Sequence, residues 1–105
     1  MIITLTDKTF QKEVVESDKP VLIDFWAPWC ASCKLLNPIM EKVSEAVGNS
    51  AKICKVDVDM CPEITKQFNI VSVPTVLILQ KGLLKDVIIG VNMQQVYINS
   101  LASSI

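Results

Sequence analysis

The chain has 105 residues, of which 50% are hydrophobic and 20% charged, and its net charge at pH 7 is −1. This length suits one core, so we expect a single domain over residues 1–105. The small net charge gives nucleic-acid binding little support, and no apolar run approaches the ~20 residues of a membrane span, so we expect neither nucleic acid nor a membrane as partner.

The first segment of the chain predicts a short strand followed by a helix. Residues 1–7 lack the charged-then-apolar layout of a signal peptide, so we expect a cytoplasmic protein. The apolar residues at 2–5 predict the strand. Thr6 or Thr9 is expected to cap a helix that runs to about residue 16.

A buried strand and a long helix follow. Pro20 opens an apolar run that continues through Trp26 and predicts the strand. Gly48 is placed to end the amphipathic helix after it. The apolar face of that helix carries Leu35, Leu36, Ile39, Met40, Val43, Ala46 and Val47.

The next elements are another strand and a short helix. Residues 51–58 predict the strand. Pro62 is suited to the first position of the helix, with Cys61 before it as the cap. Asn69 can close this helix in the left-handed conformation.

The last segment predicts a hairpin and a final helix. Residues 75–79 and 83–89 are strands joined by a turn at Lys81-Gly82. Asn92 with Gln95 resembles a capping box. The apolar stripe of the helix is Met93, Tyr97, Leu101 and Ile105.

The order of these elements predicts an α/β fold. Strands that alternate with helices indicate a parallel core covered on both faces, and the final hairpin adds an antiparallel edge. We therefore expect a mixed central sheet of about five strands flanked by about four helices.

The chain has four cysteines, Cys30, Cys33, Cys54 and Cys61, and no histidine. Without an imidazole, Cys-His protease chemistry is excluded. In a reducing compartment a close pair of cysteines indicates a catalytic or metal-binding role. Cys54 and Cys61 are seven residues apart and do not form a second Cys-x-x-Cys, so a four-thiolate zinc site is poorly supported and we expect no metal.

Cys30 and Cys33 come directly after the predicted strand that ends at Trp26. This places both sulfurs in the first turn of the next helix, where free N–H groups and the helix dipole favour a thiolate. Residues at i and i+3 share a helix face, so the two thiols can close into a disulfide. The pair is typical of a dithiol redox site.

Several further motifs accompany this pair. They are Asp24-Phe25-Trp26-Ala27-Pro28-Trp29-Cys30, Cys33-Lys34, Pro38, Lys55-Val56-Asp57-Val58-Asp59, Val73-Pro74-Thr75, Gly82 and Gly90. With them the chain resembles the thioredoxin family along nearly its whole length. The resemblance implies the thioredoxin fold and a general reductant of protein disulfides. It also implies no bound cofactor, a monomer, a thioredoxin reductase as electron donor and disulfide-containing target proteins.

The resemblance implies a catalytic set of Cys30, Cys33, Asp24 and Lys55. Cys30 would attack the target disulfide, and Cys33 would resolve the mixed disulfide. Asp24 would act through water as proton acceptor for Cys33, with its charge tempered by Lys55. An acid in an apolar strand should have a raised pKa. The alternative is that Asp24 only ends the strand or accepts a backbone hydrogen bond.

The resemblance also implies a docking surface around the cysteines. Trp29 would flank the nucleophile, and Val73 with Pro74 would face it. In the family the bond before this proline is cis, and the adjacent backbone pairs with the substrate. Gly90 would leave room for the substrate chain.

The chain departs from the family at several positions. Ala31-Ser32 replaces the usual glycine and proline between the cysteines and is expected to tune the reduction potential. Val71 and Ser72 stand where other members have a basic residue or glycine, which affects the choice of partner. Cys54 is expected to be an inert core thiol. Cys61 is a neutral capping thiol or, because it lies at a helix start, the more reactive of the two extra cysteines.

Two other functions remain open at this stage. The Ala31-Ser32 dipeptide favours a more oxidising, isomerase-like protein, although no export signal supports it. A non-catalytic binding subunit could use the same fold as a docking surface, but would not need Cys30, Cys33, Asp24 and Pro74.

Overall fold

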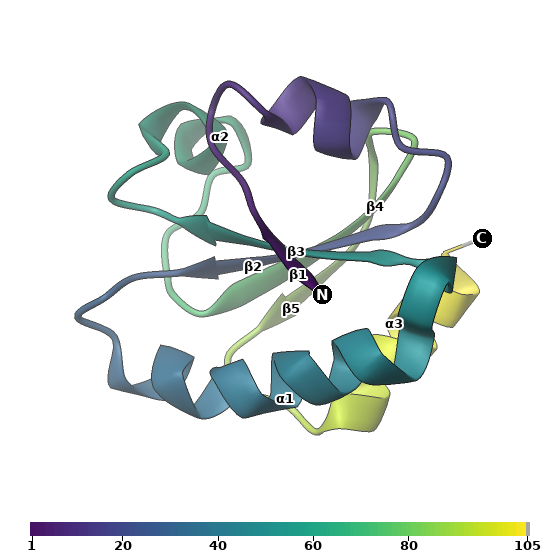
Figure 1. Ribbon diagram of the computed structural model, residues 1–105. Coiled ribbons are helices and arrows are strands. Elements are labelled where there is room, and N and C mark those ends of the chain that lie inside the picture. Colours follow the sequence, from purple (N-terminus) through teal and green to yellow (C-terminus); the bar gives the residue numbers. More distant parts are fainter. Residues whose placement is uncertain (105) are drawn as a thin grey trace.

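A mixed sheet lies at the centre of the molecule, with the strand order β1-β3-β2-β4-β5 (Figure 1). The computed structural model describes residues 1–104, so Ile105 of the last apolar stripe lies outside the described residues. Within residues 1–104 the strands are β1 (Ile2–Thr4), β2 (Val21–Trp26), β3 (Lys52–Asp57), β4 (Thr75–Gln80) and β5 (Leu83–Ile89). β1, β3 and β2 run parallel, whereas β4 is antiparallel to both β2 and β5. This confirms the expected parallel core with an antiparallel edge.

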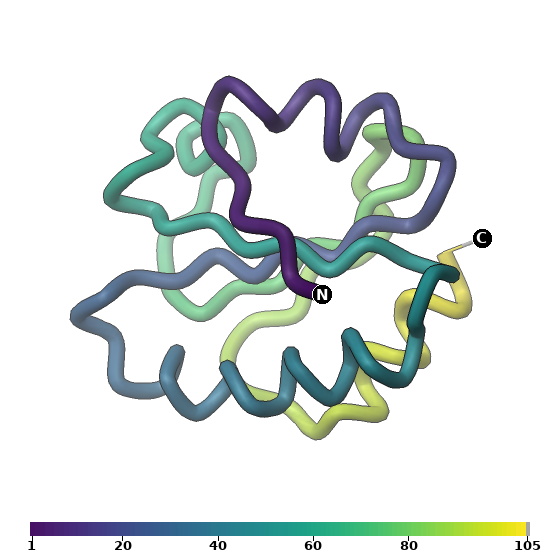
Figure 2. The backbone as a smooth tube through the Cα atoms, in the orientation of Figure 1, coloured from purple at the N-terminus to yellow at the C-terminus, as the bar shows by residue number. Residues whose placement is uncertain are grey.

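Helices cover both faces of the sheet (Figures 1 and 2). In the described part of the chain they are η1 (Gln11–Val15), α1 (Ala31–Val47), the short η2 (Gly48–Ser50), α2 (Pro62–Gln67) and α3 (Gln94–Ser103). α1 and α3 pack on one face, and η1 and α2 on the other (Figure 1). No helix among residues 1–104 is long and apolar enough to cross a membrane.

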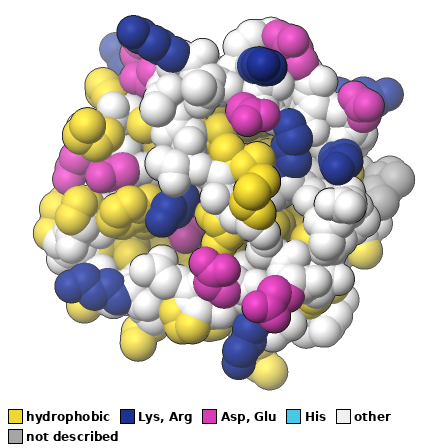
Figure 3. All heavy atoms as spheres, viewed as in Figure 1, with side chains coloured by type: hydrophobic (Ala, Val, Ile, Leu, Met, Phe, Trp, Pro, Cys, Tyr) yellow, Lys and Arg dark blue, Asp and Glu magenta, His cyan; other side chains and the backbone are white. Residues whose placement is uncertain are grey.

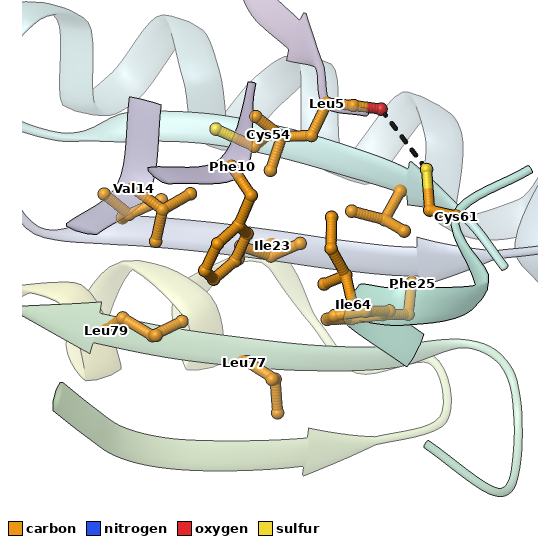
Figure 4. Packing of buried hydrophobic residues seen from close by; sticks show 12 residues of the cluster. Leu5, Phe10, Val14, Ile23, Phe25, Cys54, Cys61, Ile64, Leu77 and Leu79 are labelled. Atoms are coloured by element: carbon orange, nitrogen blue, oxygen red, sulfur yellow. Dashed lines mark hydrogen bonds between the residues drawn. The ribbon is translucent and has the colours of Figure 1, made fainter. Parts of the chain in front are cut away.

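The alternation of side chains along β2 fills the core on both sides of the sheet. Ile23 and Phe25 belong to the cluster beneath η1 and α2 (Figure 4), whereas Leu22 joins Tyr97 in the cluster beneath α1 and α3. Each fully buried side chain of this kind stabilises the fold by about 1.5–3 kcal/mol. Asp24 shares the side of Leu22 and is only 3% exposed, so a carboxyl group occupies a position where the strand otherwise buries apolar groups.

The first helix differs from the expected one. η1 is a short π-helix that begins at Gln11, and its N-cap Phe10 forms no side-chain capping bond. Neither threonine is the N-cap of η1, since Phe10 holds that position. Instead the hydroxyls of Thr6 and Thr9 each accept from the other's backbone N–H, at 3.2 Å and 2.9 Å. The two threonines thus form a closed turn before the helix, and the prediction that one of them caps it is wrong.

The start of α2 was predicted only in part. Cys61 occupies the N-cap position and Pro62 the first helical position, as expected, but the Cys61 side chain makes no capping bond. Asp7 caps the helix instead, since its carboxylate accepts from the N–H groups of Ile64 at 3.0 Å and Glu63 at 3.4 Å. The cap therefore comes from a residue far away in the sequence.

The predicted cap of the last helix also differs from the structure. α3 begins at Gln94 with Met93 as its N-cap and without a side-chain cap, so the Asn92–Gln95 capping box is wrong. The Asn92 backbone N–H donates to the Tyr97 hydroxyl at 3.1 Å, and Gln95 donates to Asn99 at 2.9 Å. The expected left-handed backbone at Asn69 and the helix end at Gly48 are confirmed.

Candidate active site

Cys30 and Cys33 lie at the junction of β2 and α1 and are joined as a disulfide, with their Cα atoms 5.4 Å apart. The chain leaves β2 at Trp26, and Cys30 becomes the N-cap of α1 with an extended backbone. Cys30 is 7% exposed and Cys33 2%, so Cys30 is the cysteine nearer to solvent. The predicted placement of both cysteines at the helix start is confirmed.

Three groups surround the Cys30 sulfur. The backbone N–H of Cys33 donates to Sγ at 3.2 Å, and the Ser32 hydroxyl lies 3.4 Å from it. The carbonyl oxygen of Val73 is 3.7 Å away. Both the N–H and the hydroxyl can donate to a thiolate, and the N-terminal end of α1 adds its dipole. The site is therefore suited to a reduced Cys30 that is ionised.

Trp29 precedes the cysteine pair and is 71% exposed. Its indole N–H donates to Asp59 Oδ2 at 3.2 Å, and the Asp59 backbone N–H donates to Asp57 Oδ1 at 2.9 Å. These bonds hold an exposed aromatic ring beside the redox pair. A groove of about 190 Å³ adjoins it, lined by Trp29, Val58, Thr65, Ile70, Val71, Ser72 and Val73.

The segment before β4 meets the cysteines from the other side. Val73 packs against Cys30 and Cys33, and the Val73–Pro74 peptide bond is cis. The Pro74 carbonyl oxygen accepts from the Gly90 N–H at 2.9 Å. The fold thus brings Val73, Pro74 and Gly90 together beside the disulfide.

Gly90 has a backbone conformation that favours glycine, with φ of 81°. A Cβ atom at this position would meet nothing within 4 Å, so the space beside it is open. The Tyr97 hydroxyl donates to the Gly90 carbonyl oxygen at 3.3 Å and accepts from Asn92, which fixes the turn after β5.

Asp24 lies inside β2, so it does not end the strand. Burial raises the pKa of its carboxyl group from 3.8 to about 7, and Lys55, opposite it on β3, opposes this rise only in part. Lys55 Nζ also lies 5.5 Å from the centroid of the Trp26 ring. Within residues 1–104 the buried Asp24 Oδ1 has no hydrogen-bond partner. The expected rise in pKa is confirmed, and Asp24 can change its protonation state near neutral pH.

A comparison with protein families gives a match over residues 1–103 to the family described as Thioredoxin. The chain belongs to the thioredoxin family. The thioredoxin of Rickettsia bellii (strain RML369-C) is 39% identical over 105 residues, 100% of both chains. The thioredoxin of Rickettsia felis (strain ATCC VR-1525 / URRWXCal2) is 40% identical over 101 residues, 96% of both chains. Thioredoxin 1 of Nostoc sp. (strain PCC 7120 / SAG 25.82 / UTEX 2576) is 40% identical over 86 residues, 82% of this chain and 80% of its own.

Thioredoxins are dithiol oxidoreductases that reduce protein disulfides, and this chain carries the cysteine pair of that activity. It is therefore a thiol–disulfide oxidoreductase with the thioredoxin fold. When Cys30 and Cys33 close into their disulfide, they give up two electrons and two protons, which is what reduction of one target disulfide to two thiols requires.

The two extra cysteines lie away from this pair. Cys54 is fully buried and its burial raises the thiol pKa to about 12, as expected for an inert core thiol. Cys61 is 2% exposed, its thiol donates to the Leu5 carbonyl oxygen at 3.6 Å, and burial together with the charges of Asp7 and Asp57 raises its pKa. Of the two alternatives for Cys61, the structure thus favours the neutral thiol; its reactivity relative to Cys54 stays a prediction. Both are free thiols, and residues 1–104 hold no group of three side chains that could bind a metal ion.

The sequence reasoning did not give roles to Asp59 and Tyr97. Asp59 was part of the family motif, and its place just beyond β3 could have suggested a partner for the exposed Trp29. Tyr97 was assigned only to the apolar stripe of α3. A buried tyrosine needs a hydrogen-bond partner for its hydroxyl, and this one uses it to fix the turn that carries Gly90.

Proposed function

We propose that the protein is a general reductant of protein disulfides in which Cys30 is the nucleophile and Cys33 the resolving thiol. The Cys30 thiolate attacks a target disulfide and releases one target thiolate. Cys33 then attacks the Cys30 sulfur, which releases the second target thiolate and leaves the Cys30–Cys33 disulfide. The observation that supports this order is the position of Cys30 at the N-cap of α1, where the Cys33 N–H points at its sulfur.

Asp24 accepts the proton of Cys33 in the second step, and Lys55 tempers the charge that results. The pKa of about 7 supports this role, because the carboxylate can take up a proton and return it near neutral pH. Asp24 and Lys55 are direct neighbours on β2 and β3, which supports their action as a pair.

Trp29, Val73, Pro74 and Gly90 form the surface on which the target docks. The Val73–Pro74 segment runs beside the disulfide and offers backbone groups to an extended target segment. The open space at Gly90 admits that segment. Val71 is 94% exposed, so the rim of this surface carries an apolar group where many family members are basic.

The electrons come from a thioredoxin reductase, and the protein carries them to disulfide-containing targets without a bound cofactor. We place this electron carrier in the cytoplasm, where disulfides are transient and catalytic. We propose that the chain is a single domain over residues 1–105 and acts as a monomer, because the proposed site is complete within one chain. Nucleic acid and membranes have no part in this cycle.

Ala31-Ser32 sets the reduction potential. The Ser32 hydroxyl lies 3.4 Å from Cys30 Sγ and can stabilise its thiolate, which favours the reduced form and raises the potential. This contact also favours the second candidate function, a more oxidising, isomerase-like protein. A reduction potential measured against glutathione separates the two.

The test is reduction of a protein disulfide with dithiothreitol as electron source. Cys30→Ser should abolish turnover, whereas Cys33→Ser should accumulate mixed disulfides because nothing resolves them. Cys61→Ala serves as the matched control and should retain turnover. Equal turnover in wild type and in both active-site variants would contradict the assigned chemistry, and full biological activity of Cys30→Ser would favour a non-catalytic binding subunit.

A further inference from the structure

A crevice of about 160 Å³ lies between α1 and the sheet, and Asp24 forms part of its wall. The other polar wall residues are Lys55 from β3 and Asn37 and Glu41 from α1. Asn37 and Glu41 are one helical turn apart, so they share a face of α1. On the side viewed in Figure 3, lysine and acidic side chains stand close together near this helix. The crevice therefore leads from a polar surface to a buried acid.

A buried proton acceptor needs such a connection. Asp24 is 3% exposed, and in the described part of the chain its Oδ1 has no hydrogen-bond partner. In the proposed cycle it takes a proton from Cys33, so that proton must leave before the next turnover. The crevice volume is sufficient for several water molecules, and its walls offer them polar partners.

The groups around Asp24 favour a proton that leaves toward α1. Lys55 faces it from β3 and stabilises the carboxylate, whereas the β4 neighbour Val76 is apolar. From α3, the Tyr97 hydroxyl is within the electrostatic influence of Asp24 but already bonds Gly90 and Asn92. On α1 the ionisable group that lines the crevice is the Glu41 carboxylate.

We propose that the crevice is the route by which Asp24 exchanges its proton with solvent, with Asn37 and Glu41 as positioning residues that keep this route polar. This inference rests on the proposed role of Asp24. As Cys33 sulfur bonds to Cys30 sulfur, the Cys33 proton passes to Asp24, and the target leaves as a thiolate. Crevice water then carries the proton from Asp24 to bulk solvent, where the released thiolate can take one up, so protons and electrons balance.

The first experiment follows single turnovers of the reduced protein with the chromogenic disulfide 5,5′-dithiobis(2-nitrobenzoate) at about pH 6. There Asp24, with its pKa of about 7, starts protonated and must lose that proton through the crevice before it can accept the proton of Cys33. The first equivalent of coloured thiolate reports attack by Cys30, and the second reports attack by Cys33. The double variant Asn37→Leu/Glu41→Leu makes the α1 wall of the crevice apolar and should slow the second phase by about 3- to 10-fold. This is a small part of the roughly 10²–10⁴-fold that positioned proton transfer supplies. The first phase should not change.

The matched control is Glu45→Leu, which adds a leucine to the exposed face of the next turn of α1, outside the crevice wall. It should leave both phases unchanged. Glu41→Gln keeps the size and polarity of the side chain and should slow the second phase less than the double variant. It also keeps the proposal testable if the double variant does not fold.

A second measurement detects proton exchange directly. The infrared C=O band of protonated Asp24, assigned by its absence in Asp24→Asn, should shift on transfer into D2O, and this shift should be slower in the double variant. A structural role of Asn37 and Glu41 would alter thermal stability but not this exchange. Unchanged second-phase and exchange rates, or an equal slowing by Glu45→Leu, would overturn the route. If Asp24→Asn itself leaves the second phase unchanged, the proposed role of Asp24 is at fault.

Discussion

Two helices of this protein begin directly after a cysteine, but only one of these cysteines is placed for chemistry. Cys30 is the N-cap of α1 and Cys61 is the N-cap of α2. The Cys30 sulfur accepts the N–H of Cys33, whereas the Cys61 thiol donates away from its helix to the Leu5 carbonyl oxygen. A position at a helix N-terminus is therefore not sufficient to make a thiol reactive.

The starts of α1 and α2 differ in which groups accept hydrogen bonds from their free backbone N–H groups. In α2 the Asp7 carboxylate takes them, and its charge lies close to Cys61. Burial and the charges of Asp7 and Asp57 then raise the pKa of the Cys61 thiol. In α1 an N–H of the first turn is directed at the Cys30 sulfur and the Ser32 hydroxyl lies within reach. The same kind of helix end thus favours a thiolate in one place and a neutral thiol in the other.

The largest expected effect is in alkylation of the reduced, folded protein. Cys30 should react first, because its thiolate is stabilised and the residue lies nearest to solvent. Cys54 and Cys61 should resist until the protein unfolds. For Cys54, a pKa raised from 9.0 to about 12 lowers the thiolate fraction by about 10³-fold, before any effect of burial on access.

Mass spectrometry of the alkylated protein measures this difference for each cysteine. The control is the same reaction in denaturant, where the four thiols should react at similar rates. Labelling of Cys61 together with Cys30 under native conditions would contradict the expected difference in reactivity between these two cysteines. It would mean that the helix N-terminus outweighs burial and the neighbouring acids.

Two aspartates of the protein, Asp7 and Asp24, differ in a similar way. Asp7 accepts two backbone N–H groups, whereas Asp24 is buried and, within residues 1–104, its Oδ1 has no hydrogen-bond partner. Below pH ~3.8 Asp24 is neutral in the folded and unfolded states. As the pH rises toward 7, only the unfolded chain loses the proton readily, so stability falls. Above pH 7 the full penalty of up to about 4 kcal/mol applies, from ~1.36 kcal/mol per pKa unit.

Asp24→Asn removes this charge with little change in volume. We expect it to stabilise the protein by up to about 4 kcal/mol at pH 8 and to have almost no effect at pH 3.5. Denaturant unfolding of the oxidised protein across this pH range measures the difference. A gain that does not depend on pH would contradict the raised pKa of Asp24.

The sequence predicted the strands and helices of the fold better than the residues that cap the helices. The apolar run of β2, the stripe of α1 and the hairpin after Pro74 are local patterns, and the corresponding elements were found where they were expected. The cysteine pair follows from the same local pattern because it lies at the junction of two such elements.

The errors concern contacts between distant segments. The cap of α2 comes from Asp7, 57 residues before Ile64, and the Cys61 thiol bonds Leu5, 56 residues away. Local reasoning placed Cys61 at a helix start but had no means to see that the β1 segment would cover it. The roles of Asp59 and Tyr97 were missed for the same reason, since their partners Trp29 and Gly90 lie on other elements.

A smaller effect is expected at Ser32, whose hydroxyl lies beside the Cys30 sulfur. A hydrogen bond from its hydroxyl to the Cys30 thiolate should raise the reduction potential by a few tens of millivolts, where ~30 mV corresponds to about 1.4 kcal/mol. Ser32→Ala should therefore make the protein more reducing by about this amount. Redox equilibration against glutathione measures it, with Ser50→Ala in η2 as a remote control. An unchanged potential would show that the hydroxyl does not contribute.

The smallest effect is expected at Asp7, which caps α2, the helix that follows Cys61. Asp7→Ala removes the cap of α2 and should destabilise the protein by about 1 kcal/mol, whereas Asp7→Asn keeps an accepting oxygen and should cost only a few tenths. Both variants remove the charge that raises the Cys61 pKa, so Cys61 should be alkylated somewhat faster in each. Because burial is the larger cause of that raised pKa, the increase in Asp7→Asn should remain far below the increase that unfolding produces. Denaturant unfolding and timed alkylation measure the two effects separately. A larger increase in the alkylation rate without loss of stability would show that the Asp7 charge, rather than burial, keeps the Cys61 thiol unreactive. The two helix starts would then differ mainly in electrostatics.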